Sequence, residues 1–377
     1  MGGISVYVHI PFCEQKCNYC DFNSFAGKED FFEAYIGSLI QEIGCCTELS
    51  NMQIDTVFIG GGTPSVLPPY YIGKIMEALG QFNISKTAEI TIEANPNSLT
   101  KEKLSTYRKS GINRLSIGLQ AIQDNLLKKL GRLHSASDFL NCYENALRAG
   151  FENISADLIF AVPGQTLSNW EESLKTLINL GLKHISCYSL IIEEGTLFYN
   201  EYEKGSLISV DDDLDRQMYY MAADILGSNN FKQYETSNFA QKGFESLHNI
   251  AYWTRKDYIG CGLSAHSLFN NKRFENTADL DKYIESSGKP HSIRQNIIQL
   301  SLKEQMEEFM FLGLRMTDGI SLDDFKNNFD TDIMTVYGDT LNKHINDNFL
   351  FFDKNIIKLT KKGADLSNVV FSDFLLD

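Results

Sequence analysis

Three cysteines stand close together near the start of the chain, at Cys13, Cys17 and Cys20. Thiolates bind iron and zinc, and three of them in one short loop can hold three irons of a [4Fe–4S] cube while the fourth iron stays open. A structural zinc site needs four ligands, usually as two separated pairs, and neither His9 nor Asp21 completes that pattern. The spacing therefore favours an iron–sulfur cluster, and three unrelated thiols are the least favoured alternative.

A glycine-rich segment and four polar residues are further candidates. Gly60-Gly61-Gly62-Thr63-Pro64 leaves backbone N–H groups bare, so it can bind a carboxylate or simply form a tight turn, and the residues alone leave these alternatives even. Asp157 interrupts an apolar stretch, where an inward-facing charge must be paired or bound. Glu93 closes a predicted strand, Gln120 follows the next one, and Arg132 comes twelve residues later. Each taken singly could be a surface or capping residue.

Two segments in the second half of the chain invite functional interpretations. His248-Asn249-x-x-Tyr252-Trp253 has the composition of an aromatic core patch with a hydrogen-bonded histidine, which composition alone favours. Gly260–Ala265 spells a dinucleotide-binding fingerprint but lacks a preceding strand–helix–strand context and a good crossover helix after it. We therefore predict no nicotinamide site there.

Charge and cysteine usage narrow the classes of protein. The 377 residues include 34 Lys and Arg against 49 Asp and Glu, a net charge of −15, which disfavours nucleic-acid binding. No apolar run reaches the roughly 20 residues of a membrane span, and no signal-peptide pattern is present. We expect a cytoplasmic protein without a disulfide framework, in which the remaining cysteines are small apolar filler: Cys45, Cys46, Cys142, Cys187 and Cys261.

Alternating strands and helices must position these residues. Crossovers of this length predict parallel strands covered by helices, with six units forming a partial barrel, or alternatively a doubly wound sheet. The predicted strands are Ile4–Ile10, Ile54–Gly60, Ala88–Ala94, Asn113–Gly118, Ile154–Val162 and His184–Ile192. The predicted helices among them are Phe31–Ile43, Leu99–Ser110, Ser137–Ala149 and Leu167–Leu180.

The pattern changes in the last third of the chain. Helical spacing over Asp211–Leu226, Ile298–Leu314 and Leu322–Phe329 and a hairpin around Asp353-Lys354-Asn355 predict a small winged-helix-like α+β domain at the end. No basic recognition helix accompanies it, so packing is favoured over DNA reading. We expect a partial barrel over residues 1–195, an extension over 196–290 with the His-Asn-x-x-Tyr-Trp segment, and the C-terminal domain over 291–377.

The first predicted strand and the cysteine segment read Tyr7-Val8-His9-Ile10-Pro11-Phe12-Cys13 and continue with Cys17, Tyr19-Cys20 and Asp21-Phe22. This pattern resembles the radical S-adenosylmethionine (radical SAM) superfamily. Within it, the chain is similar to the branch of the oxygen-independent coproporphyrinogen III oxidases and the HemW-type heme chaperones. The resemblance implies a partial (β/α)6 barrel, a cluster on the three cysteines, and SAM bound to its open iron.

The resemblance also implies roles for the remaining candidates. One SAM would contact Tyr7, Gly61 and Glu93, and a second SAM would contact Tyr19, Gly62, Thr63, Gln120, Arg132 and Asp157. In HemW-type proteins the His-Asn-x-x-Tyr-Trp motif is associated with heme, which makes His248 a candidate axial ligand.

Two departures separate the branches of this family. The oxidases carry a fourth cysteine two positions after the third, where this chain has Phe22, and a longer segment before the first strand. Both favour a chaperone that binds heme and passes it to acceptor proteins over an oxidase that decarboxylates coproporphyrinogen III. A radical SAM enzyme acting on something other than a tetrapyrrole stays open. The acceptor and the electron donor are not named by the sequence.

Overall fold

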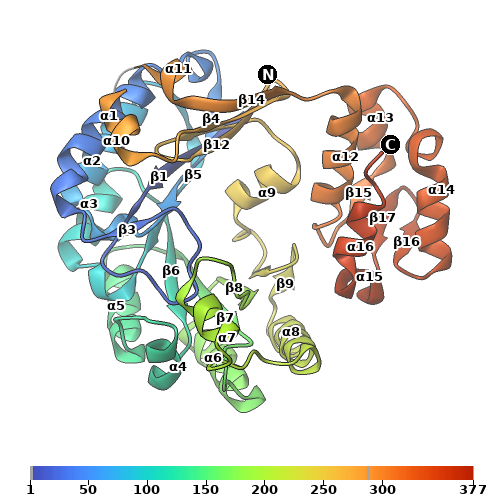
Figure 1. The fold of residues 1–377 in the computed structure, drawn as a ribbon, viewed down its shortest axis with the longest axis horizontal. Helices are drawn as coiled ribbons and strands as arrows, with labels where there is room; N and C mark the ends of the chain where they lie inside the picture. The colour runs from blue at the N-terminus through green and yellow to red at the C-terminus, as the bar shows by residue number, and fades with distance from the viewer. Residues whose placement is uncertain (1–2, 287–288, 377) are drawn as a thin grey trace.

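The computed structural model describes residues 3–286 and 289–376. Its body is a curved mixed sheet of twelve strands in the order β14-β13-β12-β11-β1-β4-β5-β6-β7-β8-β10-β9 (Figure 1). Neighbouring strands from β1 to β8 pair in parallel. The predicted α/β fold and its six parallel strands are thereby confirmed: β1 (Ile4–Ile10), β4 (Gln53–Gly61), β5 (Asn83–Ala94), β6 (Arg114–Gln120), β7 (Asn153–Phe160) and β8 (His184–Ser189).

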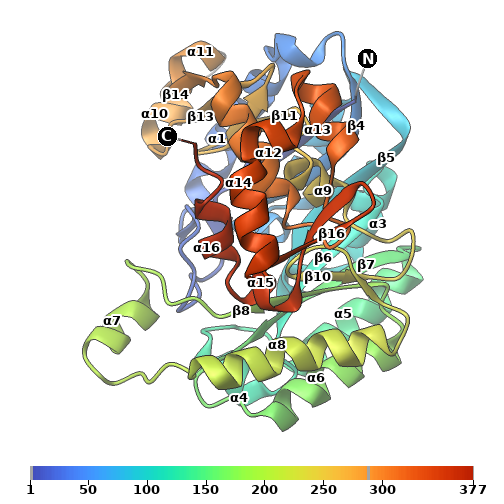
Figure 2. The ribbon, with the colours of Figure 1, turned by 90° about the vertical axis from the view of Figure 1, so that its right-hand side faces the viewer.

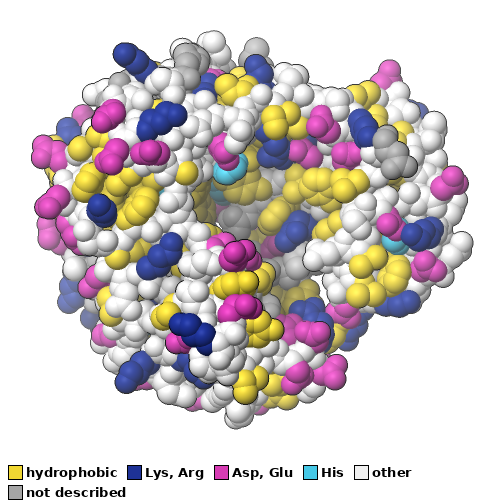
Figure 3. Space-filling model, viewed as in Figure 1, with side chains coloured by type: hydrophobic (Ala, Val, Ile, Leu, Met, Phe, Trp, Pro, Cys, Tyr) yellow, Lys and Arg dark blue, Asp and Glu magenta, His cyan; other side chains and the backbone are white. Residues whose placement is uncertain are grey.

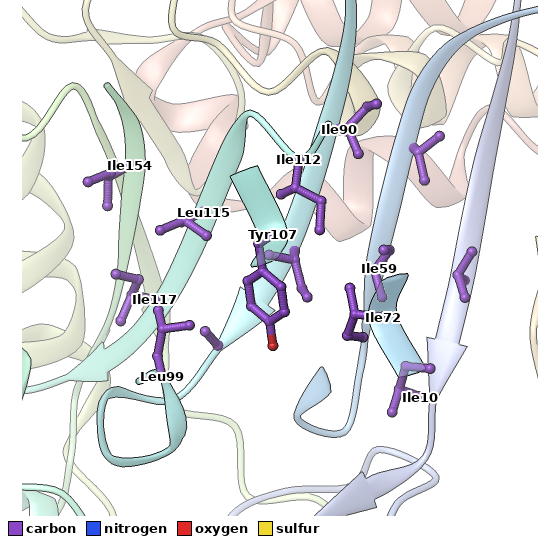
Figure 4. Packing of buried hydrophobic residues seen from close by; sticks show 14 of the residues in the cluster. Ile10, Ile59, Ile72, Ile90, Leu99, Tyr107, Ile112, Leu115, Ile117 and Ile154 are labelled. Carbon is purple, nitrogen blue, oxygen red and sulfur yellow. The ribbon is translucent and has the colours of Figure 1, made fainter. Parts of the chain in front are cut away.

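Amphipathic helices pack on the outer face of this sheet (Figure 1). Capping boxes fix where two of them begin, because Ser135 pairs with Asp138 and Thr166 pairs with Asn169 at their first turns. Figure 4 shows aliphatic side chains from several strands, among them Ile59, meeting Tyr107 and other helix residues in one core. The helices between the strands are α1 (Phe32–Gly44), α2 (Pro69–Leu79), α3 (Lys101–Lys109), α4 (Asp124–Lys129), α5 (Ala136–Arg148) and α6 (Leu167–Leu180).

Segments after β8 extend the sheet at both edges. The strand β11 adds to β1 in parallel, which makes it a seventh parallel strand that the sequence did not predict. The next three strands follow it as antiparallel neighbours, and β10 pairs antiparallel with β8. The strands of the extension are β9 (Lys232–Gln233), β10 (Asn238–Ala240), β11 (Tyr258–Cys261), β12 (His266–Phe269), β13 (Lys272–Asn276) and β14 (Arg294–Gln299).

Helix α12 begins later than predicted. Its first residue is Leu302 rather than Ile298, because Ile298 belongs to β14 and Ser301 forms a capping box with Glu304. The last strand of the sheet thus lies after residue 291, and the limits of the three domains stay predictions. The helices of the extension are α7 (Leu197–Glu203), α8 (Asp212–Gly227), α9 (Leu247–Trp253), α10 (Leu280–Glu285) and α11 (Pro290–Ile293).

The Gly260–Ala265 segment connects β11 to β12 and opens no helix. A dinucleotide fingerprint needs a helix there to receive the pyrophosphate. Gly262 has a φ of +107°, and a Cβ added to it would meet the His9 carbonyl oxygen at 2.6 Å. These glycines therefore serve close backbone packing.

The C-terminal part has a hydrophobic core of its own, with buried residues from Met306 to Phe374. Figure 2 shows the helices and the hairpin of this part. The predicted hairpin is present and joins β15 in a three-stranded sheet. Glu308 on α12 ties this part to the body through Arg255, at 2.8 Å, and Arg273, at 2.5 Å. Its elements are α12 (Leu302–Gly313), β15 (Ile320–Ser321), α13 (Leu322–Phe329), α14 (Ile333–Asn346), β16 (Leu350–Asp353), β17 (Ile356–Leu359), α15 (Lys361–Asp365) and α16 (Ser367–Ser372).

No helix among the described residues is long and apolar enough to cross a membrane.

Removing the Trp170 side chain should destabilise the body of the protein. The indole is fully buried on α6, packs against Phe160, and donates its N–H to the Met218 carbonyl oxygen at 2.8 Å. Trp170→Ala should lower the free energy of unfolding by about 3–5 kcal/mol, measured by urea denaturation. The matched control is Leu147→Ala on exposed α5 surface, which should stay within about 0.5 kcal/mol of the parent. Equal losses in both variants would contradict this account of the core.

Candidate functional site

A cavity of about 440 Å³ lies at the carboxyl ends of the parallel strands. Parallel pairing brings these strand ends to one edge of the sheet, where active sites of such folds lie. We name this space the strand-end cavity. Of the predicted site residues, it is lined by Cys13, Cys17, Tyr19, Cys20, Gly61, Gly62, Thr63, Glu93, Gln120, Arg132 and Asp157.

The cysteine loop that follows β1 is tied down on both sides. Two short strands, β2 (Phe12–Cys13) and β3 (Phe25–Ala26), pair within it in parallel. The Asn18 amide N–H donates to the Leu130 carbonyl at 3.0 Å, and its side chain donates to the Lys129 carbonyl at 2.9 Å. The three cysteines are partly exposed and form no disulfide. The loop therefore presents its thiols to the strand-end cavity.

Hydrogen-bond donors point at two of these thiols. The Arg132 guanidinium lies 3.3 Å from Cys17 Sγ, and the Thr63 hydroxyl lies 3.5 Å from Cys13 Sγ. Burial raises the pKa of Cys13 and of Cys20, so metal binding would have to drive their deprotonation. Both donors favour the thiolate form of the sulfur that they contact.

The donor set fits a cluster better than a single ion. Among residues 3–286 and 289–376, no group of three or more His, Cys, Asp or Glu side chains is gathered closely enough to hold one metal ion. In a cube each thiolate binds its own iron, so the sulfurs stand apart from one another. The three thiols, placed around a shared cavity, match that requirement.

The glycine segment at the end of β4 is held against the first strand and the cysteine loop. Gly61 has a φ of +109° and donates its N–H to Glu93 Oε2 at 3.0 Å. A Cβ on Gly61 would collide with the His9 ring, and one on Gly62 would lie 2.7 Å from the Phe12 carbonyl oxygen. The glycines are thus required by packing. The N–H groups of Gly62 and Thr63 donate to the Ile10 and Phe12 carbonyls, so of the two alternatives left open by the sequence the geometry favours the tight turn over a carboxylate-binding backbone.

Two carboxylates face the cavity from strands on either side of β6, Glu93 from β5 and Asp157 from β7. Burial, reinforced by Asp157, raises the pKa of Glu93 to about 8. Burial also raises the pKa of Asp157, which accepts a hydrogen bond from Ser116 Oγ at 3.2 Å. Two buried acids close together cannot both ionise easily. The pair therefore creates a place where a ligand with positive charge is favoured.

Arg132 connects the cysteine loop to two strand ends. Besides Cys17, it donates to the Asn95 side-chain oxygen at 2.5 Å and to the Gly118 carbonyl at 2.8 Å. Asn95 also donates to Thr63 Oγ1 at 3.2 Å. The sequence reasoning missed Asn95 and Ser116 as site residues. Their positions in the sequence could have indicated both residues, because Asn95 directly follows β5 and Ser116 lies on β6 together with Gln120.

Tyr7 lies outside the strand-end cavity. Its hydroxyl is 2.9 Å from His9 Nδ1, and both residues line a separate cavity next to Tyr252 and Trp253. The His9 ring packs against Gly61, which belongs to the strand-end cavity. Tyr7 and His9 therefore stand between the two spaces.

His248 is buried in the interior of the body, with both ring nitrogens engaged. Nδ1 lies 2.7 Å from Thr56 Oγ1, and Nε2 lies 2.9 Å from the Tyr252 hydroxyl. The ring stacks on Phe58, and burial lowers the pKa of His248 to about 3, so it is neutral. Neither nitrogen is free to bind iron in this arrangement. The geometry favours the packed core histidine over the axial ligand that the resemblance implied.

Comparisons with known proteins identify the family to which the chain is similar. Residues 7–177 match the model of the radical SAM superfamily, and residues 300–366 match that of the HemN C-terminal domain. The chain is similar to a coproporphyrinogen III oxidase, HemN, from Escherichia coli, whose structure superposes with a TM-score of 0.86 at 22% identity over 99% of this chain and 90% of that one. At 22% identity, this structural similarity shows a shared fold only.

Two curated relatives are similar over nearly their whole length. The heme chaperone HemW of Lactococcus lactis is 38% identical over 99% of this chain and 97% of its own. The heme chaperone HemW of Bacillus subtilis is 37% identical over 98% of this chain and 99% of its own. The cysteine loop, the sheet and the C-terminal part are all included in these matches. The chain belongs to the HemW family of radical SAM proteins.

Proposed function

We propose that this protein is a heme chaperone that holds a [4Fe–4S] cluster and SAM, binds heme, and delivers it to acceptor proteins. The observation that carries the proposal is the end-to-end similarity to proteins named heme chaperone HemW. It is supported by Phe22, which stands two positions after the third cysteine and is 60% exposed at the mouth of the strand-end cavity.

Cys13, Cys17 and Cys20 would hold the cluster at the open side of the cavity. Such a cluster supplies an electron that can cleave the sulfonium of SAM. Arg132 orients the Cys17 thiolate and adds positive charge beside it, while Thr63 donates to Cys13. The absence of side chains at Gly61 and Gly62 leaves room for a ligand beside the backbone, whose N–H groups already donate to Glu93 and to the Ile10 carbonyl.

Glu93 and Asp157 would hold the cationic part of SAM. A bound ammonium or sulfonium offsets the repulsion between these two buried carboxylates. Tyr19, Gln120 and Arg132 line the same cavity and are proposed as further contacts, including those for a second SAM. Asn95 would position Arg132 and Thr63 without needing to touch the ligand.

The cluster should depend on the three cysteines of the loop. After anaerobic reconstitution the parent should contain about four irons per chain, and Cys17→Ala should lose the cluster because one corner of the cube has no ligand. Iron and sulfide analysis with visible absorbance measures this. The control is Cys45→Ala, an exposed cysteine outside the loop, which should keep the full iron content. Four irons retained in Cys17→Ala would reject the assignment.

SAM affinity should rise with pH up to about 8. Below that pH Glu93 is a neutral acid in the ligand-free protein, and above it Glu93 is a carboxylate that attracts the ligand's positive charge. Binding should therefore release a proton, and affinity should increase by at most about tenfold per pH unit. Calorimetry in buffers of different ionisation enthalpy measures both quantities. Glu93→Gln should bind SAM more weakly and with less proton release, and an unchanged pH slope in this variant would contradict the role of Glu93.

The alternative is an oxygen-independent coproporphyrinogen III oxidase. An oxidase must convert coproporphyrinogen III to protoporphyrinogen IX at the expense of SAM, whereas a chaperone must bind heme unchanged. The reconstituted full-length protein, given SAM, reductant and coproporphyrinogen III without oxygen, should form no protoporphyrinogen IX. In a parallel titration it should bind hemin with a defined Soret band. Sustained formation of protoporphyrinogen IX would return the protein to the oxidase class.

A further inference from the structure

A second cavity of about 390 Å³ opens between the sheet and the C-terminal part, separate from the strand-end cavity. Its walls come from β1, α9, β11, β12, β13 and α12, which are distant in the sequence. Figure 3 shows that the face between the body and the C-terminal part is hollowed and carries hydrophobic side chains. The volume is within the range of small-molecule sites.

Aromatic rings form much of the wall. Tyr252 and Tyr258 meet edge to face with centroids 4.6 Å apart, and Trp253 lies beside Tyr252 on α9. Leu268 and Leu312 add apolar surface. Such a lining suits a flat, largely apolar ring system.

An imidazole with a free nitrogen stands at the rim of this second cavity. The side chain of His266 is 67% exposed, and its Nε2 lies 3.1 Å from Glu275 Oε2. Its Nδ1 has no hydrogen-bond partner among the described residues. Metal-binding histidines usually carry a carboxylate on one nitrogen, which orients the ring and makes the other nitrogen a better ligand. Of the three histidines that lie in or beside this space, His9 and His248 have both nitrogens engaged.

Unsatisfied buried donors and three arginines lie beside the aromatic wall. The buried Trp253 Nε1 and Arg315 Nε atoms have no hydrogen-bond partner, and the Arg315 guanidinium lies 4.7 Å from the centre of the Trp253 ring. Arg255 and Arg273 share the single carboxylate of Glu308. Buried donors without partners are costly, so a ligand that brings acceptors would be stabilised here. Carboxylates are the acceptors that suit these cations.

We propose that the second cavity is where the heme is held, with His266 as the axial ligand of its iron and with Trp253 and Arg315 facing its carboxylates. This assignment rests on the proposed heme chaperone function. It replaces His248 as the iron ligand and gives that residue a positioning role, because His248 holds the hydroxyl of Tyr252 in the wall.

The test compares hemin with iron-free protoporphyrin IX on the full-length protein. Only hemin can use an axial ligand, so His266→Ala should weaken hemin binding by about tenfold or more and shift the Soret band, while protoporphyrin affinity stays at the parent value. The magnitude follows because even the outer partners of metal-bound histidines change metal affinity by about 10- to 100-fold. Glu275→Gln should give a smaller loss of the same kind. Imidazole added to His266→Gly should restore the Soret position.

A matched control separates His266 from His248. The exposed His266 should be replaceable without loss of folding, whereas His248→Ala should lower the melting temperature and leave the Soret position of bound hemin unchanged. If the parent binds hemin and His266→Ala binds it equally well with the same spectrum, the site is wrong and the chaperone function stands. A Soret shift in folded His248→Ala would move the ligand to that residue. Failure of the parent to bind hemin would reject the function itself.

Discussion

The parallel pairing of β1, β4, β5, β6, β7 and β8 forces their six carboxyl ends to a single edge of the sheet. Every residue of the strand-end cavity depends on that constraint, because Gly61, Glu93 and Gln120 come from different strands and meet only there. Arg132 then fastens the cysteine loop to the same edge through Asn95 and the Gly118 carbonyl. A slip of one strand by one residue would turn these side chains away from the cavity.

A second constraint is the burial of polar groups on the inner face of the sheet. The N-terminal N–H groups of α9 at Leu247 and His248 donate to the Glu89 carboxylate, which lies 4.0 Å from the buried Arg114. The anchored helix carries His248 into contact with Thr56 and leaves Tyr252 and Trp253 at the second cavity. One motif thus has two roles: its histidine fixes the helix, and its aromatic rings form a wall.

Local patterns made part of this predictable from the sequence. The strands, the cysteine loop and the terminal hairpin follow from hydrophobic alternation and turn residues, which act over a few positions. The parallel pairing of β11 with β1 was not predicted, because it joins residues about 250 positions apart in the chain. The partner of His248 at Thr56 and the cavity beside His266 likewise arise only when distant segments meet, and no spacing rule records such contacts.

The separation of the two cavities bears on the class of the protein. An oxidase must bring its tetrapyrrole into the strand-end cavity, where a radical formed from SAM could reach it. Here the aromatic second cavity lies behind Tyr7 and His9, and the His9 ring is pressed against Gly61 and held by hydrogen bonds to Tyr7 and the Asn23 carbonyl. Burial lowers the pKa of His9, so this partition is neutral as well as packed. Heme held in the second cavity, as we propose, would be shielded by this partition from chemistry at the cluster, which a carrier requires and an oxidase does not.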